Sequence, residues 1–425
     1  MTLGPNTSEI VGCTASESSR QHVRLSSGMA SDTSRTDSHA GKKTLDEQAR
    51  EHGVYGFEIA AIHQGRRVTL ATGQNVTDFA TNCPFGINEL PAVQLAAIRA
   101  INSFGGLHAS IASARATTYL TRIIIDRLAE MKGPASSARI YPTTLSANTA
   151  TADGIKRSGA QIVIDPRSHA TMMSAVSGIP QERVTISKNS VSVAEAYSST
   201  CTRTVFLAGD GLYSMGKFAD YEAIRRALLQ CPNLRVWLDD AHSVGMHGRN
   251  GRGEAMEQLY DFANRVVVSG SFGKAFGAAG GFVVAPESFI DEMLKASVAD
   301  RFSCNLDVAA QGAIVASMNL LSDSNQLRSL QRTLEQRLAQ FDGILSKQRI
   351  VTEQHGSKIA FRLVPFNGPE VAIEVAGKML TNGVMTTPVY YPTIGKGTGG
   401  IRVSISAAHS PEQVDALATM FVDAL

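Results

Sequence analysis

The 425-residue sequence lacks the features that mark several large classes of protein. No apolar run approaches the roughly 18 residues that a membrane-spanning helix needs. The N-terminus has no basic start followed by an apolar core, so no secretory signal is visible. The 40 basic and 38 acidic side chains leave a net charge of only +2, which gives no electrostatic footprint for nucleic acid or an anionic membrane. We therefore expect neither as a partner.

Cysteine is sparse and scattered along the chain. The cysteines are odd in number and form no CxxC pair, which argues against a disulfide framework and against a zinc site. They are Cys13, Cys83, Cys201, Cys231 and Cys304. We expect no metal centre, and a reducing cytoplasm is the natural location for such a chain.

The first 44 residues are poor in aromatic and large aliphatic side chains, rich in Ser and Thr, and without helical or strand period. This composition predicts a disordered leader. A transit peptide is the alternative, but transit peptides contain few acidic residues. The acids that argue against it are Glu9, Glu17, Asp32 and Asp37.

From about residue 45 the composition is globular, with 43% hydrophobic against 18% charged residues in the chain. We expect a capped helix at 44–53, two strands around a turn at 54–73, and helices at 90–105 and 117–133. Short runs rich in Val, Ile and Leu then alternate with helical or loop segments. These runs are 138–142, 161–165, 184–187, 204–209, 235–239 and 265–270. The alternation predicts an α/β fold with a mostly parallel, doubly wound sheet.

Polar side chains follow these apolar runs, at the positions where an open sheet of this kind binds its ligands. They are Thr143 and Thr144, His169, Asp210 to Ser214, Asp239 and His242, and Ser271 and Lys274. Each has an ordinary structural explanation, such as a helix cap for the two threonines. Their joint placement at one edge of the sheet favours a ligand site.

Lys274 and Asp239 indicate which ligand this site binds. Lys274 lies in the glycine-rich run SGSFGKAFGAAGG at 269–281, and Asp239 ends the apolar run RVWL. Pyridoxal phosphate needs a lysine to hold its aldehyde and an acid to keep its pyridine nitrogen protonated. The glycines let backbone approach a flat ring, and Ser271 offers a hydroxyl to the phosphate. The pairing predicts a pyridoxal phosphate enzyme.

Two other classes of function fit the sequence less well. The segment VWLDDAH at 236–242 resembles the acidic strand end of nucleoside triphosphatases, where carboxylates hold magnesium. Such enzymes also need a GxxxxGK[ST] loop, and the sequence contains none. A regulator that merely binds the cofactor would need a DNA-binding extension or a basic face, and neither is visible.

Several motifs together resemble the α-oxoamine synthase family of fold-type-I pyridoxal phosphate enzymes. The resemblance covers about residues 75 to 425. It rests on DDAHSVGMHGRNGRG from Asp239, SGSFGKAFGAAGG, DGLYSMGKFADYEAI from Asp210, DPRSHATM from Asp165, IRVSISAAH from Ile401, and the NDYLG-like run NCPFG from Asn82. It implies a large cofactor-binding domain and a smaller C-terminal α/β domain.

The resemblance implies a role for each cofactor-binding residue. Lys274 would hold the aldehyde and later move the α-proton, as a catalytic amine of lowered pKa. Asp239 and His242 would complete the catalytic set, at the pyridine nitrogen and the phenolic oxygen, while His169 stacks on the ring. The groups implied at the phosphate are Ser271 and the helix start at Thr143, Thr144 and Leu145. Ser214 is also implied as a cofactor-binding residue.

The resemblance also implies a substrate side. Arg402 would bind the amino acid's carboxylate, because its planar fork matches two carboxylate oxygens. Asn82 and Ser214 would assist it. Without the resemblance, a lone arginine on a strand is usually a surface charge, and Ser214 is an ordinary turn residue.

The sequence departs from the family pattern where the second substrate would bind. Ile111 and Ala112 stand near the positions where a family loop carries Ser and Arg. A Ser-Thr segment with following prolines is replaced by FSCNLDV, which contains Ser303, Cys304 and Asn305. TTLSAN and NCPFG also differ from the family's usual segments. These changes indicate a retained cofactor site with a remodelled substrate chamber.

The reaction that the family implies is a pyridoxal phosphate-dependent acyl transfer. An amino acid would condense with an acyl thioester, of coenzyme A or acyl carrier protein, and lose carbon dioxide to give an α-amino ketone. The alternative is a different electrophile, or β- or γ-elimination or replacement on an activated amino acid such as S-adenosylmethionine. A homodimer with the site at its interface is expected. The expected division is a bridging segment at 45–91, a large domain at 92–312 and a small domain at 313–425.

Overall fold

A computed structural model describes residues 43–106, 116–200, 202–292 and 294–425. The expected leader therefore lies outside the described residues except at its last two positions, and Ile111 and Ala112 lie outside them as well. Helix α1 (Leu45–Glu51) begins with a capping box, in which Thr44 and Glu47 satisfy each other's backbone N–H groups. The capped helix predicted there is confirmed.

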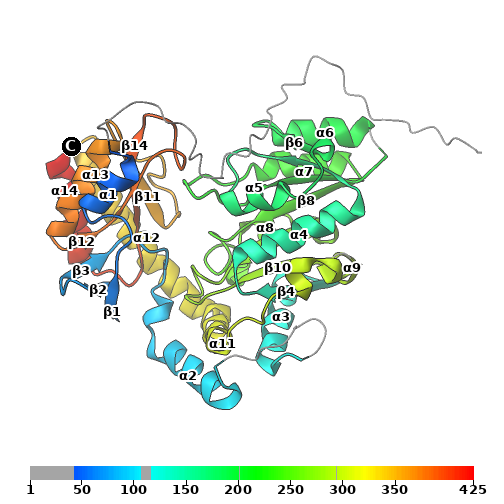
Figure 1. Ribbon diagram of the computed structural model, residues 1–425, viewed down its shortest axis with the longest axis horizontal. Coiled ribbons are helices and arrows are strands. Elements are labelled where there is room, and N and C mark those ends of the chain that lie inside the picture. Colours follow the sequence, from blue (N-terminus) through cyan, green and yellow to red (C-terminus); the bar gives the residue numbers. More distant parts are fainter. Residues whose placement is uncertain (1–42, 107–115, 201, 293) are drawn as a thin grey trace, which may run out of the picture.

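A seven-stranded sheet forms the centre of the larger lobe, on the right of Figure 1. Its strand order is β4-β10-β9-β8-β7-β5-β6, and only β10 runs against the others. The strands are β4 (Ser136–Tyr141), β5 (Gln161–Ile164), β6 (Val184–Ile186), β7 (Val205–Asp210), β8 (Leu234–Asp239), β9 (Val266–Ser271) and β10 (Gly281–Pro286). The predicted mostly parallel sheet is confirmed, whereas β10 was not predicted.

Helices cover both faces of this sheet because successive strand residues point to opposite sides. Leu207, Val236 and Val268 pack in one apolar core with α3 and α7, while Phe206, Trp237 and Val267 pack in another with α4 and α5. The helices of this lobe are α3 (Tyr119–Lys132), α4 (Thr144–Ser158), α5 (Ala170–Val176), α6 (Ser190–Thr200), α7 (Tyr221–Gln230), α8 (Glu254–Gln258), α9 (Glu287–Glu292) and α10 (Val298–Arg301).

A second lobe, on the left of Figure 1, contains two smaller sheets. One has the order β1-β2-β3-β12 and the other the order β11-β14-β13. The strands are β1 (Ile59–His63), β2 (Arg67–Leu70), β3 (Asn75–Asp78), β11 (Phe361–Phe366), β12 (Val384–Met385), β13 (Thr387–Val389) and β14 (Gly399–Ser404). The helices are α1, α12 (Ser324–Lys347), α13 (Pro369–Thr381) and α14 (Pro411–Ala424).

Helix α2 (Pro91–Phe104) packs along α11 (Val308–Ser322) at the base of the two lobes (Figure 1). The division expected at residue 312 falls inside α11, and it stays a prediction. Five 3₁₀ helices complete the described structure: η2 (Ile87–Glu89), η3 (Gln181–Arg183), η4 (Arg249–Gly251), η5 (Tyr260–Arg265) and η6 (Leu294–Ala296). None of the helices in the described part of the chain combines the length and apolarity that crossing a bilayer requires.

Candidate active site

Lys274 lies in the tight turn that joins β9 to the antiparallel β10. Backbone hydrogen bonds close this turn, from Phe272 N–H to Gly280 O and from Ala278 N–H to Phe272 O, at 2.9 and 3.0 Å. Gly277 has a φ of +64°, and a Cβ there would meet the Asn88 nitrogen at 2.7 Å. Position 277 therefore needs glycine for two reasons. Its backbone has a positive φ, and a side chain there would collide with Asn88.

Lys274 and the three charged residues that shift its pKa come from four distant parts of the chain. Burial lowers the pKa of its amine; Asp239 opposes this shift, Arg402 adds to it and Asp210 opposes it. Desolvation disfavours the charged form of a lysine and makes a larger share of the amine available as a base or nucleophile. Burial and the nearby Arg402 therefore favour the neutral amine of the half-buried Lys274, the form that can accept a proton.

Asp239 ends β8 and is held by two donors. Its Oδ2 accepts from Asn148 Nδ2 at 2.9 Å, and its Oδ1 accepts from the Ala241 N–H at 3.1 Å. Asn148 is fully buried on α4, one turn after Thr144. The sequence prediction missed Asn148, although it lies on the helix whose first residues were singled out. Each carboxylate oxygen keeps an acceptor position for a further donor.

Asp210 ends the neighbouring strand β7 and is the cross-strand partner of Asp239. Its two oxygens accept from the backbone N–H of His169 at 3.0 and 3.2 Å. Burial raises the pKa of Asp210, and the adjacent Asp239 raises it further. Asp210 therefore fixes the start of the segment that carries His169.

The two histidines predicted for the site approach it from different sides. His169 caps α5 (Ala170–Val176), and its Nδ1 lies 2.8 Å from Thr171 Oγ1 while the side chain stays exposed. The His242 ring lies 5.6 Å from the Phe361 ring, edge to face. Burial lowers the pKa of His242 well below its usual value, and the nearby Lys274 and Arg402 lower it further. His242 is therefore a neutral imidazole near neutral pH.

The start of α4 is the segment predicted to bind the phosphate. The Thr143 hydroxyl caps the helix by accepting from the Ser146 N–H at 3.1 Å. The N–H groups of Thr144 and Leu145 have no partner inside the helix, because they belong to its first turn. A Cβ at Gly281 would come within 2.6 Å of Thr143 O and Thr144 N. The segment predicted to hold the phosphate thus lies directly against β10.

Strand pairing places Ser271 near the start of α4. It is the cross-strand partner of Gly281, which in turn touches the helix start at Thr143. Its Oγ accepts from the Gly273 N–H at 3.0 Å, so its own proton is free to reach an anion. Ser214 lies in the turn after β7 that Tyr213 N–H and Lys217 O close at 2.8 Å. The roles predicted for Ser214 stay predictions.

Arg402 is a buried arginine on β14 whose Nε and Nη2 have no hydrogen-bond partner among the described residues. Its guanidinium carbon lies 4.1 Å from the centre of the Phe361 ring. Burial lowers the pKa of Arg402 to about 10, so it remains a cation near neutral pH. A buried cation with unused donors is complementary to a carboxylate.

Asn82 lies on the same side of β14 as Arg402. Ser404 Oγ donates to Asn82 Oδ1 at 2.8 Å, and Ser404 is two residues from Arg402, so both point to one face of the strand. Because its oxygen accepts from Ser404, the Asn82 amide has its NH₂ group left to donate. The predicted neighbours Asn82 and Arg402 are thus brought together.

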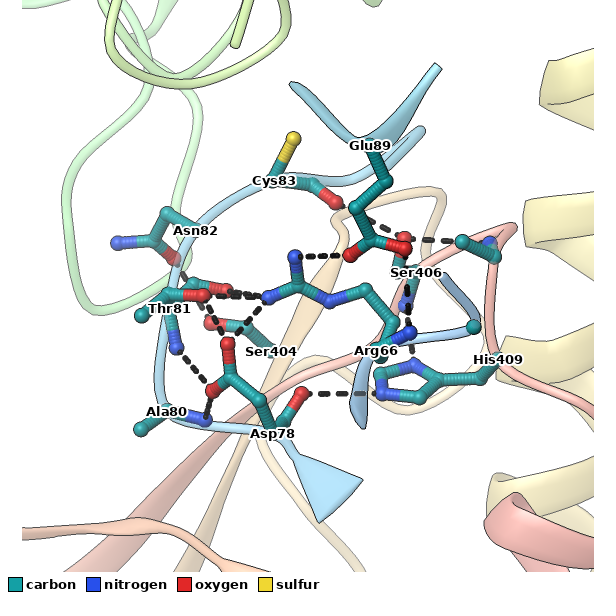
Figure 2. A network of polar contacts seen from close by, with 12 residues as sticks. Arg66, Asp78, Ala80, Thr81, Asn82, Cys83, Glu89, Ser404, Ser406 and His409 are labelled. Atoms are coloured by element: carbon teal, nitrogen blue, oxygen red, sulfur yellow. Dashed lines mark hydrogen bonds and ion pairs between the residues drawn. The ribbon is translucent and has the colours of Figure 1, made fainter. Parts of the chain in front are cut away.

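Figure 2 shows the polar network that fixes the segment containing Asn82. Buried Arg66 donates to Asp78 Oδ2 at 2.7 Å and to Glu89 Oε1 at 3.1 Å, and it also contacts the Thr81 hydroxyl. His409 Nε2 lies 3.1 Å from the Asp78 carbonyl oxygen. Together with the hydrogen bonds from Ser404 to Asn82 and from Ser406 to the Cys83 carbonyl, these groups attach residues 78–83 to β14 and the segment that follows it.

Comparisons with known proteins identify the family and the fold. The family model for aminotransferase class I and II matches residues 68–421. The 2-amino-3-ketobutyrate coenzyme A ligase of Escherichia coli strain K12 is 28% identical, over 87% of this chain and 92% of the relative. The 8-amino-7-oxononanoate synthase of Geobacter sulfurreducens is 26% identical, over 87% and 94%. The structure of Sphingomonas wittichii serine palmitoyltransferase superposes with a TM-score of 0.80 at 20% identity, over 89% and 94%.

Proposed function

Because the chain belongs to the aminotransferase class I and II family, we propose that it is a pyridoxal phosphate-dependent acyltransferase. It condenses an amino acid with an acyl thioester and releases carbon dioxide, which gives an α-amino ketone. The relatives support this reaction over elimination or replacement, since one is named a coenzyme A ligase of an amino keto acid and another an amino oxo acid synthase. The single observation that supports it most is the placement of Lys274 among Asp239, Asp210 and Arg402.

The described residues fit pyridoxal phosphate. Asp239 offers a buried carboxylate with acceptor positions left over, and Asn148 fixes its orientation. The first turn of α4 offers N–H groups to the phosphate, and Ser271 adds a hydroxyl. Lys274 would hold the aldehyde, and His169 would cover the ring. When bound, the cofactor withdraws electrons from the α-carbon of the amino acid attached to it.

In the proposed reaction, different side chains transfer the proton and bind the charged groups of the substrate. The Lys274 amine, whose pKa burial lowers, removes the α-proton and later returns one to the product. Arg402 binds the carboxylate with its unused Nε and Nη2 donors and orients the bond to carbon dioxide. Asn82 donates its NH₂ group beside it, and His242 supplies a neutral imidazole on the cofactor side.

We also propose that the protein is a homodimer in the cytoplasm. On α2, the side chains that face away from α11 are apolar at helical spacing: Leu95, Ile98 and Ile101 are 50%, 51% and 43% exposed. Val93 and Ala100 on the other face are buried. An apolar stripe in solvent suits a second copy of the chain. Light scattering tests this, and replacing Ile98 by Lys is expected to give monomers.

The reaction is tested by product release from purified protein loaded with pyridoxal phosphate. A panel of acyl-CoA donors is offered with each proteinogenic amino acid, and free CoA and carbon dioxide are measured. At least one pair is expected to release both in equal amounts, and Lys274→Ala is expected to release neither. The absence of both products with every pair would exclude condensation on coenzyme A thioesters.

A further inference from the structure

Phe361 contacts one residue proposed for the cofactor side of the site, His242, and one proposed for the substrate side, Arg402. Its ring is 3% exposed. One face lies 4.1 Å from the guanidinium carbon of Arg402, and the ring also makes an edge contact with His242, at 5.6 Å between centroids. A single aromatic side chain on β11 therefore contacts two groups that the proposed reaction uses, one on each lobe.

Strand register explains how the ring reaches Arg402. In the antiparallel pair β11–β14, Phe361 is opposite Ser404 and Leu363 is opposite Arg402. Residues two apart on a strand share a face, so these four side chains project on the same side of the sheet. Phe361 is the diagonal neighbour of Arg402, and such diagonals lie within reach of aromatic and long side chains.

A second buried arginine, Arg362, allows the hydrogen-bond partners of the two guanidinium groups to be compared. Arg362 follows Phe361 on β11 and is fully buried. Its Nε and Nη2 donate to the two oxygens of Asp342, both at 2.8 Å, and its Nη1 donates to backbone carbonyls of residues 359 and 361. Arg362 thus has its donors satisfied by the protein, as a buried structural cation requires.

Arg402 is held differently. Among the residues that the structure describes, no carboxylate forms an ion pair with it, and its Nε and Nη2 make no hydrogen bond. The ring of Phe361 attracts the cation through its face. This attraction uses none of the five N–H donors of the guanidinium. An acid in the same place would occupy the donors that a substrate carboxylate needs.

We propose that Phe361 is the positioning residue that holds the Arg402 guanidinium flat, with its donors free for the carboxylate of the amino acid. The proposal rests on the proposed function, because it assumes that Arg402 binds that carboxylate. Phe361 therefore acts on the affinity for ligands that carry a carboxylate, and amines that lack one are insensitive to it. A merely structural role of Phe361 would affect both classes of ligand equally.

The test compares amino acids with their decarboxylated counterparts on protein loaded with pyridoxal phosphate. Absorbance titrations give dissociation constants for glycine, L-alanine and L-serine, and for methylamine, ethylamine and ethanolamine. Phe361→Leu and Phe361→Met remove the aromatic face, and Phe361→Tyr retains it. Leu363→Met is the matched control, since it alters a neighbour on the same strand face without removing a ring.

In the two non-aromatic variants we expect every amino acid that binds the wild type to bind about 2- to 30-fold more weakly, as loss of one cation–π contact implies. Amine affinities stay within twofold, and Phe361→Tyr restores amino-acid affinity to within twofold of the wild type. Two non-aromatic variants are used so that a folding failure of one leaves the comparison intact.

Equal weakening of amines and amino acids, unchanged affinities in both non-aromatic variants, or a loss in Leu363→Met as large as theirs would each overturn the proposal. Failure of the proposed function looks different. Wild-type protein that takes up pyridoxal phosphate but binds neither these three nor any other proteinogenic amino acid would overturn that function together with this inference. Wild-type protein that binds them while the Phe361 variants bind as tightly would overturn the inference alone.

Discussion

Asp210 and Asp239 are cross-strand partners at the ends of β7 and β8, so two buried carboxyl groups stand side by side at the edge of the sheet. Like charges this close cannot both ionise freely. Asp239 has the Asn148 amide as a fixed donor, whereas burial and Asp239 raise the pKa of Asp210. We therefore propose different tasks for the two acids, with Asp239 serving the cofactor and Asp210 holding the His169 backbone.

Replacing these acids is expected to give unequal losses. Asp239→Asn removes the charge that keeps the cofactor's ring nitrogen protonated, and we expect a loss in kcat on the order of 100-fold or more. Asp210→Asn keeps an acceptor for the His169 N–H and resembles the protonated acid, so its loss stays below about 10-fold. Steady-state kinetics on both variants check this, and a larger loss in Asp210→Asn would contradict the division of tasks.

Ser404 and Ser406 form a matched pair on the segment that follows Arg402. Ser404 Oγ donates to the Asn82 side chain, and Ser406 Oγ donates to the Cys83 carbonyl, both at 2.8 Å. Ser404→Ala frees the Asn82 amide to turn, so we expect KM for the amino acid to rise about 2- to 10-fold. Ser406→Ala is expected to lower the melting temperature without changing KM. Equal KM values in Ser404→Ala and wild type would show that this hydroxyl does not orient Asn82.

The buried pair of Arg362 and Asp342 is expected to matter for stability alone. Asp342→Ala leaves the fully buried guanidinium without its carboxylate and is expected to cost about 3–5 kcal/mol in the free energy of unfolding. The exposed pair Lys358–Glu335, at 2.8 Å, is the control, and Glu335→Ala is expected to cost below about 1 kcal/mol. Urea denaturation measures both, and similar costs would refute the distinction between the two pairs.

Lys132 makes stability depend on pH. It is 2% exposed, its amine donates to the Ala263 carbonyl, and burial lowers its pKa from 10.5 to about 7. Between these two pH values the unfolded state binds the proton and the folded state does not, so this lysine makes stability rise with pH. Lys132→Met removes that rise, which is at most about 1.4 kcal/mol per pH unit. Denaturation at pH 7, 8 and 9 measures it, and parallel curves for variant and wild type would contradict the shift.

Local sequence patterns were sufficient to predict the parallel strands and the polar residues at their ends. Buried parallel strands form continuous apolar runs, and the last residue of each run defines the sheet edge, so Asp239 and Lys274 could be assigned together. Strand β10 was missed because it follows the glycine-rich turn directly and runs antiparallel, without the intervening helix that marked the others.

The missed site residues depend on contacts between distant segments. Asn148 reaches Asp239 only because α4 crosses the edge of the sheet, and the two are 91 positions apart. The contact between Phe361 and Arg402 follows from the register of β11 against β14, which no local pattern specifies. A buried aromatic residue in a strand reads as core in any sequence, so nothing distinguished Phe361 beforehand.

The position at which the cofactor attaches to the chain is the most decisive test of the proposed site. Protein incubated with pyridoxal phosphate is treated with borohydride, which fixes the cofactor covalently to the lysine that holds it, and is then digested for mass spectrometry. We expect the modification at Lys274 and its loss in Lys274→Ala. Among the other lysines, Lys132 is the strongest competitor for the cofactor aldehyde, because its pKa of about 7 also makes its amine a good nucleophile. Modification at Lys132 or another lysine, with Lys274 unmodified, would contradict the central claim.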